Sequence, residues 1–260
     1  MDVAGKHVVV TGAAGGIGEA LARRFAKEGA RAVVLADVDA ARVRAAADAI
    51  GDIATAAEVD VRSRAAITAL IDDAEARSGP IDLFCSNAGI AIAGTVEVEE
   101  ADWQRIWEIN VMSHVHAAHV LVPRMVERGG GWLLNTASAA GLLAQIGSSP
   151  YSVTKAAAVA FAESLAIEYG DKGVGVSVLC PQAVRTNMTA GSEGGGVAGV
   201  DGMMEPDTLA DAVIAGLAEE SFLILPHPEV REYEQRKTAN RDRWLKGMQR
   251  LRDRYAGNAL

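Results

Sequence analysis

Tyr151 and Lys155 lie four residues apart at the start of a long apolar stretch with helical periodicity. On a helix, side chains with this spacing share one face, so the phenol and the ammonium group would lie side by side. A free tyrosine has a pKa of about 10, and a neighbouring cation favours the phenolate and lowers that pKa. The spacing therefore indicates a phenol that exchanges a proton near neutral pH. Taken alone, the pair is more typical of a half-buried tyrosine beside a solvated lysine.

A glycine-rich segment near the N-terminus has the spacing of a phosphate-binding turn. An apolar run at Lys6–Thr11 precedes Gly12-Ala13-Ala14-Gly15-Gly16-Ile17-Gly18, and a helical pattern and a second apolar run, Arg31–Asp37, follow it. This order predicts a strand, a turn, a helix and a strand. Glycines let the backbone approach a pyrophosphate, and the helix N-terminus offers unpaired N–H groups. The segment therefore predicts a dinucleotide-binding unit; no lysine follows the last glycine, so it is not a Walker-type loop.

Asp37 indicates which dinucleotide to expect. An acidic residue at the end of the second strand can bind the hydroxyls of the adenosine ribose. A 2′-phosphate would need a cation in the turn or just after that strand. Ala13 and Ala14 occupy the turn and Val38 follows Asp37, so the sequence predicts NAD and disfavours NADP. Arg42 is close enough in sequence to keep NADP open.

Apolar runs and helical stretches continue to alternate along the chain. Further strands are expected at Ile53–Val61, Asp82–Asn87, Trp132–Ala137, Gly175–Cys180 and Phe222–Leu225, and further helices at Ala40–Ile50, Ala65–Ala76, Trp103–Met125, Tyr151–Ile167 and Leu209–Ala218. Seven strands alternating with six helices predict a single α/β domain of the Rossmann type. Its sheet would be a doubly wound, parallel seven-stranded sheet with helices on both faces. Ligands of such sheets bind beyond the C-terminal strand ends, where Asn87, Ser138 and Pro181 fall.

Length, charge and cysteine content set further limits. The chain has 260 residues, half of them hydrophobic, and a net charge of −9, which suits one well-buried domain and disfavours a nucleic-acid partner. Cys85 and Cys180 lie in apolar strand-like runs, as is typical of reduced thiols in an intracellular protein. The chain begins without the features of a secretory signal, and no apolar run approaches the roughly 18 residues of a membrane helix. We therefore expect a cytoplasmic protein that does not contact membranes.

Three closely spaced histidines raise the question of a metal. His116 and His119 lie three residues apart on an expected helix, shortly after His114. No carboxylate or cysteine cluster accompanies them, so histidines of the core or of an interface are favoured. We expect no bound metal.

Two segments depart from the regular alternation. Residues 188–204 contain six glycines, and a long loop beyond a strand end is often a substrate lid, so we expect a flexible substrate loop there, with plain disorder as the alternative. The catalytic domain is expected to span residues 1–228. Residues 229–260 are expected to form a charged helical tail with a net charge of +4, against −13 for the rest of the chain.

The tail carries an apolar stripe at helical spacing. It consists of Trp244, Met248, Leu251 and Tyr255. The stripe favours a solvated helix packed on its own domain or on a neighbouring subunit. Contact of a basic helix with an anionic membrane surface is the other interpretation.

Together these motifs resemble the short-chain dehydrogenase/reductase family from about Lys6 to Leu225. The matching motifs are Thr11 with the glycine-rich turn, Asp60-Val61, Asn87-Ala88-Gly89, Asn110, Ser138, Tyr151, Lys155, and Pro181 with Thr186. The resemblance implies an NAD(P)-dependent oxidoreductase that forms dimers or tetramers by pairing Trp103–Met125 and Tyr151–Ile167 between subunits. Gln182 stands where the family often has glycine after the proline.

The resemblance also implies residue roles. Tyr151 would take the hydroxyl proton of an alcohol as hydride leaves for the nicotinamide, or donate a proton to a carbonyl in reverse. Lys155 would lower the pKa of Tyr151 and hold the nicotinamide ribose, and Ser138 would hydrogen-bond the reacting oxygen. Asn110, through its backbone in a distorted helix, would hold a water linked to Lys155. The implied cofactor-binding residues are Gly12, Gly15, Gly16, Ile17, Gly18, Asp37, Asp60, Val61, Asn87, Ala88, Gly89, Tyr151, Lys155, Pro181, Val184 and Thr186.

The expected substrate pocket is mostly apolar. Its walls include Ser138, Ala140, Leu142, Gln145, Tyr151, Gln182 and Met188, and no arginine or lysine is expected among them. This favours a hydrophobic secondary alcohol or its ketone over a charged substrate, with hydride exchanged with NAD(H). Two alternatives stay open: an NADPH-dependent ketone or 3-oxoacyl-thioester reductase, and a non-catalytic dinucleotide-sensing protein.

Overall fold

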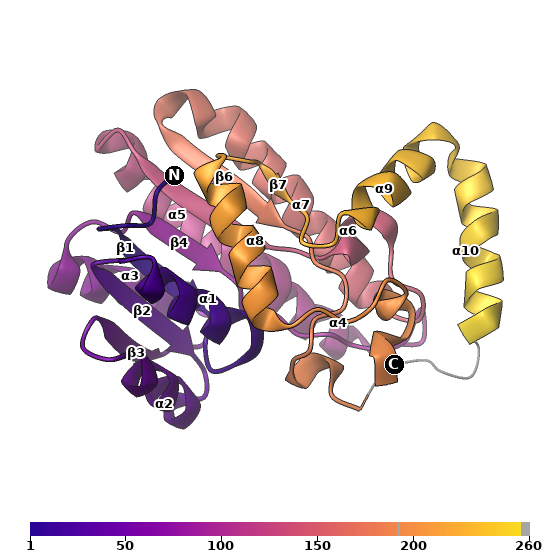
Figure 1. Cartoon of the computed structure of the whole chain (residues 1–260), viewed down its shortest axis with the longest axis horizontal. Helices are drawn as coiled ribbons and strands as arrows, with labels where there is room; N and C mark the ends of the chain where they lie inside the picture. The colour runs from indigo at the N-terminus through magenta and orange to yellow at the C-terminus, as the bar shows by residue number, and fades with distance from the viewer. Residues whose placement is uncertain (192, 256–260) are drawn as a thin grey trace.

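Seven parallel strands form one sheet in the computed structural model, which describes residues 1–191 and 193–255 (Figure 1). The strands are β1 (His7–Thr11), β2 (Ala32–Asp37), β3 (Ala54–Glu58), β4 (Leu83–Ser86), β5 (Gly131–Thr136), β6 (Val174–Leu179) and β7 (Leu223–Ile224). Their order is β3-β2-β1-β4-β5-β6-β7, so the winding direction reverses between β1 and β4. This confirms the predicted doubly wound parallel sheet of the Rossmann type.

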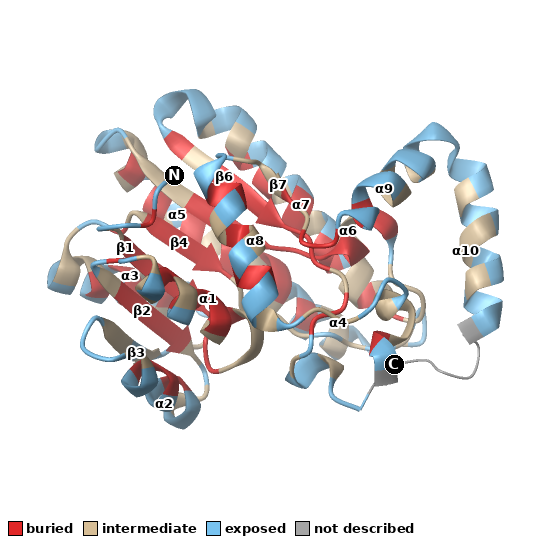
Figure 2. Cartoon of the chain, in the orientation of Figure 1, coloured by how far each residue is buried: buried red, intermediate tan, exposed pale blue. Residues whose placement is uncertain are grey.

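Helices cover both faces of the sheet because its central strands are apolar on both sides (Figure 2). Val8 and Val10 of β1 belong to one buried cluster and Val9 to the other, as the alternation of side chains along a strand requires. The first cluster contains residues of α1 (Gly16–Lys27), α2 (Ala40–Ile50) and α8 (Pro206–Ala218), and the second contains residues of α3 (Arg64–Ser78), α5 (Ser113–Glu127) and α7 (Ser149–Tyr169).

The long helix expected at Trp103–Met125 is not continuous. It consists of α4 (Glu100–Trp107), a π-helical turn at Glu108–Met112, and α5. The π-helical turn turns Asn110 inward, where its amide donates to the Ile90 carbonyl and accepts from the Ile90 N–H, both at 2.9 Å. A π-helical turn contains one more residue than a turn of α-helix, and such turns often occur at functional sites.

Other predicted boundaries shift by a few residues. The strand expected at Ile53–Val61 ends at Glu58, where its register with β2 ends, and Asp60 then caps a turn by accepting from the N–H of Arg62 at 3.0 Å. A short helix that the sequence did not predict, α6 (Ala139–Leu143), begins at Ser138, whose hydroxyl accepts from the N–H of Ala140 at 3.1 Å.

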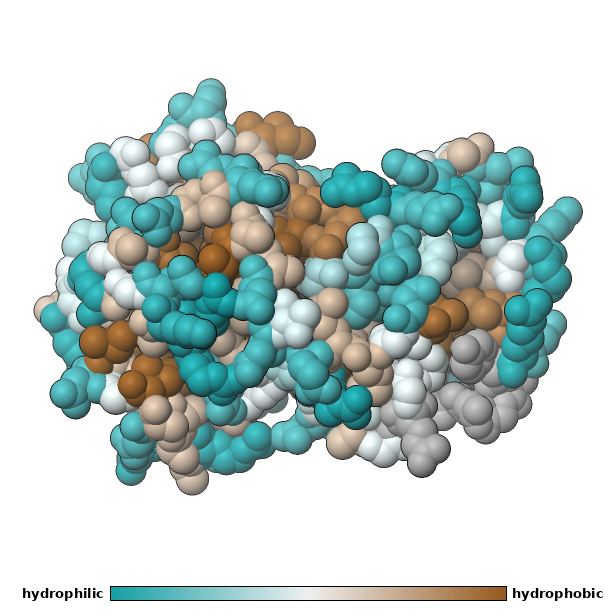
Figure 3. Space-filling model, viewed as in Figure 1, coloured by the Kyte–Doolittle hydropathy of each residue, from teal (hydrophilic) through white to brown (hydrophobic). Residues whose placement is uncertain are grey.

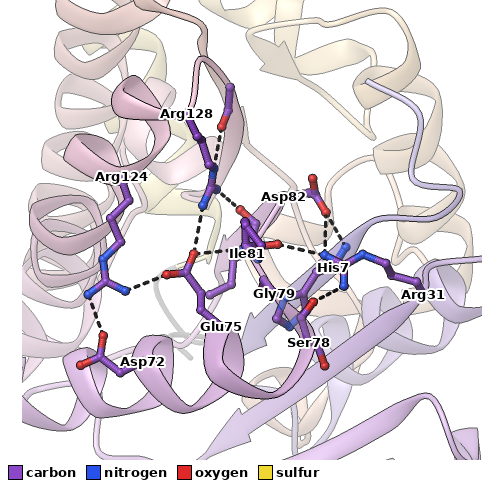
Figure 4. Close-up of polar contacts among 12 residues, drawn as sticks. His7, Arg31, Asp72, Glu75, Ser78, Gly79, Ile81, Asp82, Arg124 and Arg128 are labelled. Atoms are coloured by element: carbon purple, nitrogen blue, oxygen red, sulfur yellow. Dashed lines mark hydrogen bonds and ion pairs between the residues drawn. The ribbon is translucent and has the colours of Figure 1, made fainter.

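Glu75 of α3 connects α5 and the segment before β4 on the side of the sheet where the strands begin (Figure 4). Its carboxylate accepts from Arg124 of α5 at 2.7 Å, from Arg128 at 3.0 Å and from the backbone of Ile81 just before β4 at 3.1 Å. Its pKa lies below the ordinary value because these donors outweigh the effect of burial. The anchor fixes α3 and α5 relative to β4 at the end remote from the expected site.

The C-terminal tail forms two helices. They are α9 (Glu229–Ala239) and α10 (Arg241–Tyr255), separated by Asn240 in an extended conformation, and α10 stands apart from the sheet (Figure 1). Two short 3-10 segments, Asn187–Thr189 and Glu193–Gly199, lie in or beside the described part of residues 188–204, and three glycines interrupt the second. The flexible substrate loop stays a prediction. None of the described helices is long and apolar enough to cross a membrane.

His114 makes the stability of the fold sensitive to acid. Burial lowers its pKa to about 4, and the nearby Lys155 contributes in the same direction. Below about pH 6.5 the unfolded chain binds a proton that folded His114 does not, so stability falls as the pH falls. We expect the free energy of unfolding, measured with urea, to drop by about 2 kcal/mol from this group between pH 7 and pH 5. His114→Gln should flatten this dependence, whereas the exposed His119→Gln should not; an unchanged slope in His114→Gln would assign the loss to other groups.

Gly18 is a position at which a side chain cannot fit. A Cβ there would lie 2.2 Å from the Gly12 carbonyl oxygen and 2.7 Å from the Asn87 amide nitrogen. We expect Gly18→Ala to lower the free energy of unfolding by about 2 kcal/mol or more, because backbone must shift. Gly170→Ala is the control, since Gly170 has φ −61° and nothing near its Cβ position. Equal unfolding midpoints for the two variants would contradict the close approach at Gly18.

Candidate active site

A cavity of about 1370 Å³ opens at the C-terminal ends of the strands and continues to the C-terminal helices. Its lining brings together nearly all the expected site residues. They are Gly12, Gly15, Gly16, Ile17, Asp37, Asp60, Val61, Asn87, Ala88, Gly89, Ser138, Ala140, Gln145, Tyr151, Lys155, Pro181, Gln182, Val184, Thr186 and Met188.

Three expected residues do not line the cavity. Gly18 packs against Gly12, and Asn110 is buried behind Ile90. Leu142 is not among the lining residues; its side chain packs against an apolar cluster that Tyr233 and Trp244 also contact, so its place in the substrate wall stays a prediction.

The ends of β1 and β4 are joined at the point where the strand order reverses. The Thr11 hydroxyl donates to the Cys85 carbonyl at 3.2 Å and accepts from the N–H groups of Asn87 and Ala88 at 3.0 and 3.2 Å. The Asn87 amide donates back to the carbonyls of Thr11 and Gly12 at 3.1 and 3.3 Å. These bonds hold the glycine-rich turn against the end of β4.

Asp37 fixes the same turn from the other side. Its carboxylate accepts from the backbone N–H of Ala14 at 3.0 Å and of Asp39 at 3.1 Å. Gly15 precedes α1 without a side-chain cap, so the first N–H groups of the helix face the cavity with no side chain on them. Such an N-terminus attracts an anion.

Arg42 lies closer to the glycine-rich turn than its sequence position suggested. A Cβ at Gly15 would lie 2.6 Å from its Nη2 atom. The oxygen of the Asn187 amide, in the orientation that satisfies both groups, accepts from Nη2 at 3.0 Å. Arg42 thus bridges the turn and the segment after β6, and both Arg42 and Asp37 line the cavity.

Asp60 and Arg62 form a pair at the same end of the cavity. The guanidinium Nη2 donates to the carboxylate at 2.6 Å, which holds the pKa of Asp60 below its ordinary value. Asp60 therefore stays ionised beside Val61.

Lys155 is a buried cation in the floor of the cavity. Its ammonium donates to the Thr136 carbonyl at 2.8 Å and lies 5.7 Å from the centre of the Tyr151 ring. Burial lowers its pKa to about 8. Gly89 leaves room for this group, because a Cβ there would lie 3.3 Å from both the lysine Nζ and the Asn110 amide oxygen.

The pKa of Tyr151 differs from the expectation. Burial raises it above the ordinary value, and the Ser138 hydroxyl only partly offsets this. The sequence predicted that Lys155 would lower the pKa of Tyr151, and this effect is not seen. The lysine ammonium is bonded to the Thr136 carbonyl, and burial lowers its own pKa. The side chains of Ser138, Tyr151 and Lys155 nevertheless line one cavity wall.

Sequence reasoning missed the cationic part of the wall. The sequence predicted no arginine or lysine in the walls of the substrate pocket, but Lys155 and four arginines of α9 and α10 line the cavity. The apolar stripe of the tail was the available signal, since arginines flank it at helical spacing. The three neighbouring histidines do not converge: His114 bonds Asn135 at 2.9 Å and His116 bonds the Val61 carbonyl at 3.4 Å.

Known proteins resemble the chain over most of its length. The family model for short chain dehydrogenases matches residues 6–194. A 1-deoxy-11-beta-hydroxypentalenate dehydrogenase of Streptomyces exfoliatus is 38% identical over 240 residues, covering 89% of this chain and 86% of that protein. A meso-2,3-butanediol dehydrogenase of Serratia marcescens is 37% identical over 188 residues, covering 72% and 74%.

The solved structures agree. A short chain dehydrogenase/reductase from Burkholderia phymatum in complex with NAD is 29% identical, with a TM-score of 0.83, and covers 90% of this chain and 93% of that one. The 3-ketoacyl-(acyl-carrier-protein) reductase from Brucella melitensis complexed with NADH is 30% identical, with a TM-score of 0.79, and covers 86% and 98%. From its motifs, its fold and these relatives, the chain belongs to the short-chain dehydrogenase/reductase family of oxidoreductases.

Proposed function

We propose that the protein transfers hydride between NAD(H) and a hydrophobic secondary alcohol or its ketone, with Tyr151 as the acid/base. The observation that carries this proposal is the convergence of Ser138, Tyr151 and Lys155 on a cavity that also contains the glycine-rich turn and Asp37. Relatives named for a hydroxypentalenate and for butanediol support a hydroxyl compound as substrate.

The residues around the turn fit a dinucleotide. The uncapped N-terminus of α1 suits a pyrophosphate, and Gly12, with φ +66°, allows the backbone to approach it. Bound nicotinamide would accept or supply the hydride. Pro181, Val184 and Thr186 line the wall proposed to hold the nicotinamide end.

The protein's own groups would handle the proton. During oxidation the Tyr151 oxygen takes the hydroxyl proton of the alcohol, while the Ser138 hydroxyl orients the reacting oxygen. Because burial raises the pKa of Tyr151, oxidation should speed up toward alkaline pH. Lys155 supplies positive charge close to the phenol, and Asn110 and Gly89 shape the space beside its ammonium.

Asp37 favours NAD over NADP. Two backbone bonds fix its carboxylate at the mouth of the cavity, where it would accept from ribose hydroxyls and repel a 2′-phosphate. Solved relatives that hold NAD and NADH support this choice. The position of Arg42 at the turn is the feature that favours the alternative, an NADPH-dependent ketone or 3-oxoacyl-thioester reductase.

Assembly and location are part of the same proposal. Val153 and Ile167 of α7 and Trp107 of α4 are exposed apolar side chains, which supports pairing of these helices in a homodimer or homotetramer. Cys85 and Cys180 are buried free thiols, which supports a reducing, cytoplasmic setting.

Replacing Tyr151 tests the catalytic proposal against a dinucleotide sensor. We expect Tyr151→Phe to lower kcat for secondary alcohols by about a thousandfold, because the proton acceptor is lost, while NADH binding measured by fluorescence changes little. Tyr169→Phe, in the last turn of α7 and outside the cavity, is the control. Unchanged turnover in Tyr151→Phe, or none in the native protein despite NADH binding, would support the sensor.

Asp37 and Arg42 can be separated by mutation. We expect Asp37→Asn to raise the ratio of NADP to NAD activity by about a hundredfold, since it removes a like charge from beside the 2′-phosphate. Adding Arg42→Gln should take back most of that gain. The ratio of kcat/KM values for the two cofactors measures both effects, and a native protein that prefers NADP would overturn the assignment of Asp37.

A further inference from the structure

The cavity extends well past the groups that would react. Its far side is formed by the inner face of α9 and α10, at the opposite end of the molecule from β3 (Figure 1). The acidic residues that line the cavity, Asp37, Asp39 and Asp60, all belong to the end near β2 and β3. The cofactor site therefore leaves this far part of the cavity for another molecule.

The C-terminal helices are anchored next to the proposed reacting groups. Val230 of α9 is fully buried against Ala139 and Leu143 of α6, the helix that begins at Ser138. Lys237 donates a hydrogen bond to the Leu142 carbonyl. The inner face of α10 thus faces the same space as Ser138 and Tyr151.

This inner face is amphipathic. Trp244, Met248 and Leu251 form its apolar stripe, and Figure 3 shows hydrophobic residues gathered beside α10. Arg243, Arg250 and Arg254 flank the stripe at helical spacing on α10, and Arg236 of α9 lines the cavity with them. Outward-facing residues such as Leu245 and Lys246 do not line the cavity.

Most of these arginines lack an acidic partner. Arg236 pairs with Glu232, whereas Arg243, Arg250 and Arg254 form no ion pair with any described side chain of residues 1–191 and 194–254. Asp201 nearby is bonded to Tyr233 at 2.9 Å and to Gln182 at 3.1 Å. No acidic side chain lines the cavity beside the three arginines in the described part of the chain, so this wall is cationic.

We propose that the substrate of this enzyme carries a carboxylate at the end remote from its hydroxyl or keto group, and that Arg243, Arg250 and Arg254 bind it. The inference rests on the proposed function and names the substrate class for that site. Leu143, Met188, Val197 and Val200 line the cavity and would contact the apolar body of the molecule. An α10 of 15 residues is about 22 Å long, enough for carboxylates at different distances from the reacting carbon.

A second copy of the chain is the rival occupant. The body of the protein carries −13 and would complement a basic helix. The arginines and the apolar stripe nevertheless line a cavity of their own chain that Tyr151 also lines. This shared cavity favours the substrate as the occupant over a second copy of the chain.

Paired probes test the inference through turnover. (ω−1)-Hydroxy fatty acids of graded length and their methyl esters differ in the distal charge and by one methyl group. We expect the native enzyme to favour an acid over its ester by about tenfold in kcat/KM, mostly through KM, and this preference to weaken with salt. The triple variant Arg243→Gln/Arg250→Gln/Arg254→Gln should lose the preference and retain activity on the esters.

A control triple variant removes three positive charges from the outward-facing side of α10. Arg241→Gln/Lys246→Gln/Arg252→Gln changes residues that do not line the cavity, so it should keep the preference for acids. Loss of the preference in both triple variants would reveal a general effect of net charge and overturn the inference.

Equilibrium binding separates this inference from the proposed function. Calorimetry on Tyr151→Phe in the presence of NAD, with dodecanoate and its methyl ester as probes, requires no turnover. Tighter binding of dodecanoate that depends on the inward arginines would support the inference even if no alcohol were oxidised. Turnover of neutral alcohols without any preference for acids would overturn the inference and leave the proposed function standing. A change of molecular mass by light scattering in the inward triple variant alone would assign the arginines to a second copy and overturn it too.

Discussion

The set of hydrogen bonds between Thr11 and the Asn87 loop is the constraint on which the rest of the site depends. A parallel sheet that reverses its winding direction leaves a crevice between two strand ends, here those of β1 and β4. One hydroxyl and one amide close the base of that crevice through five contacts to backbone. Gly18 packs directly on them, so the start of α1 is placed by backbone contact. The orientation of the first N–H groups of α1 follows from this contact.

Burial dominates the electrostatics of the reacting groups. The spacing of Tyr151 and Lys155 suggested that the cation would lower the pKa of the phenol, and in the structure burial has the larger effect on both groups. The ammonium compensates for its burial by donating to the Thr136 carbonyl at the end of β5. The Ser138 hydroxyl favours the ionised form of the phenol but does not outweigh its burial. Tyr151 and Lys155 are thus both buried, and in such surroundings added positive charge near the phenol would have a large effect on its pKa.

The sequence predicted those elements of the fold that are specified by short stretches of the chain. Strand positions followed from apolar runs, and the glycine-rich turn followed from its spacing between a strand and a helix. The π-helical turn did not follow from local pattern, because it depends on a bond between Asn110 and Ile90, twenty residues away; only the family resemblance implied a distorted helix there. The packing of Leu142 against the C-terminal helices could not be predicted, because the short helix α6 and its contact with α9 do not follow from local pattern. The arginines of the tail were missed for a related reason: periodicity identified the stripe but not the surface that it faces.

The attachment of α10 has a further consequence for motion. This helix continues from α9 beyond the break at Asn240, and among the described residues of the apolar cluster on α6 only Trp244 comes from it. Its amide hydrogens should therefore exchange with solvent through small local openings, while those of β1 and β4 require global unfolding. An outward movement of α10 alone would leave the sheet undisturbed, because α9 stays anchored on α6 through Val230. Access to the proposed carboxylate site would then depend on the free energy of bending at Asn240, which is separate from the stability of the domain.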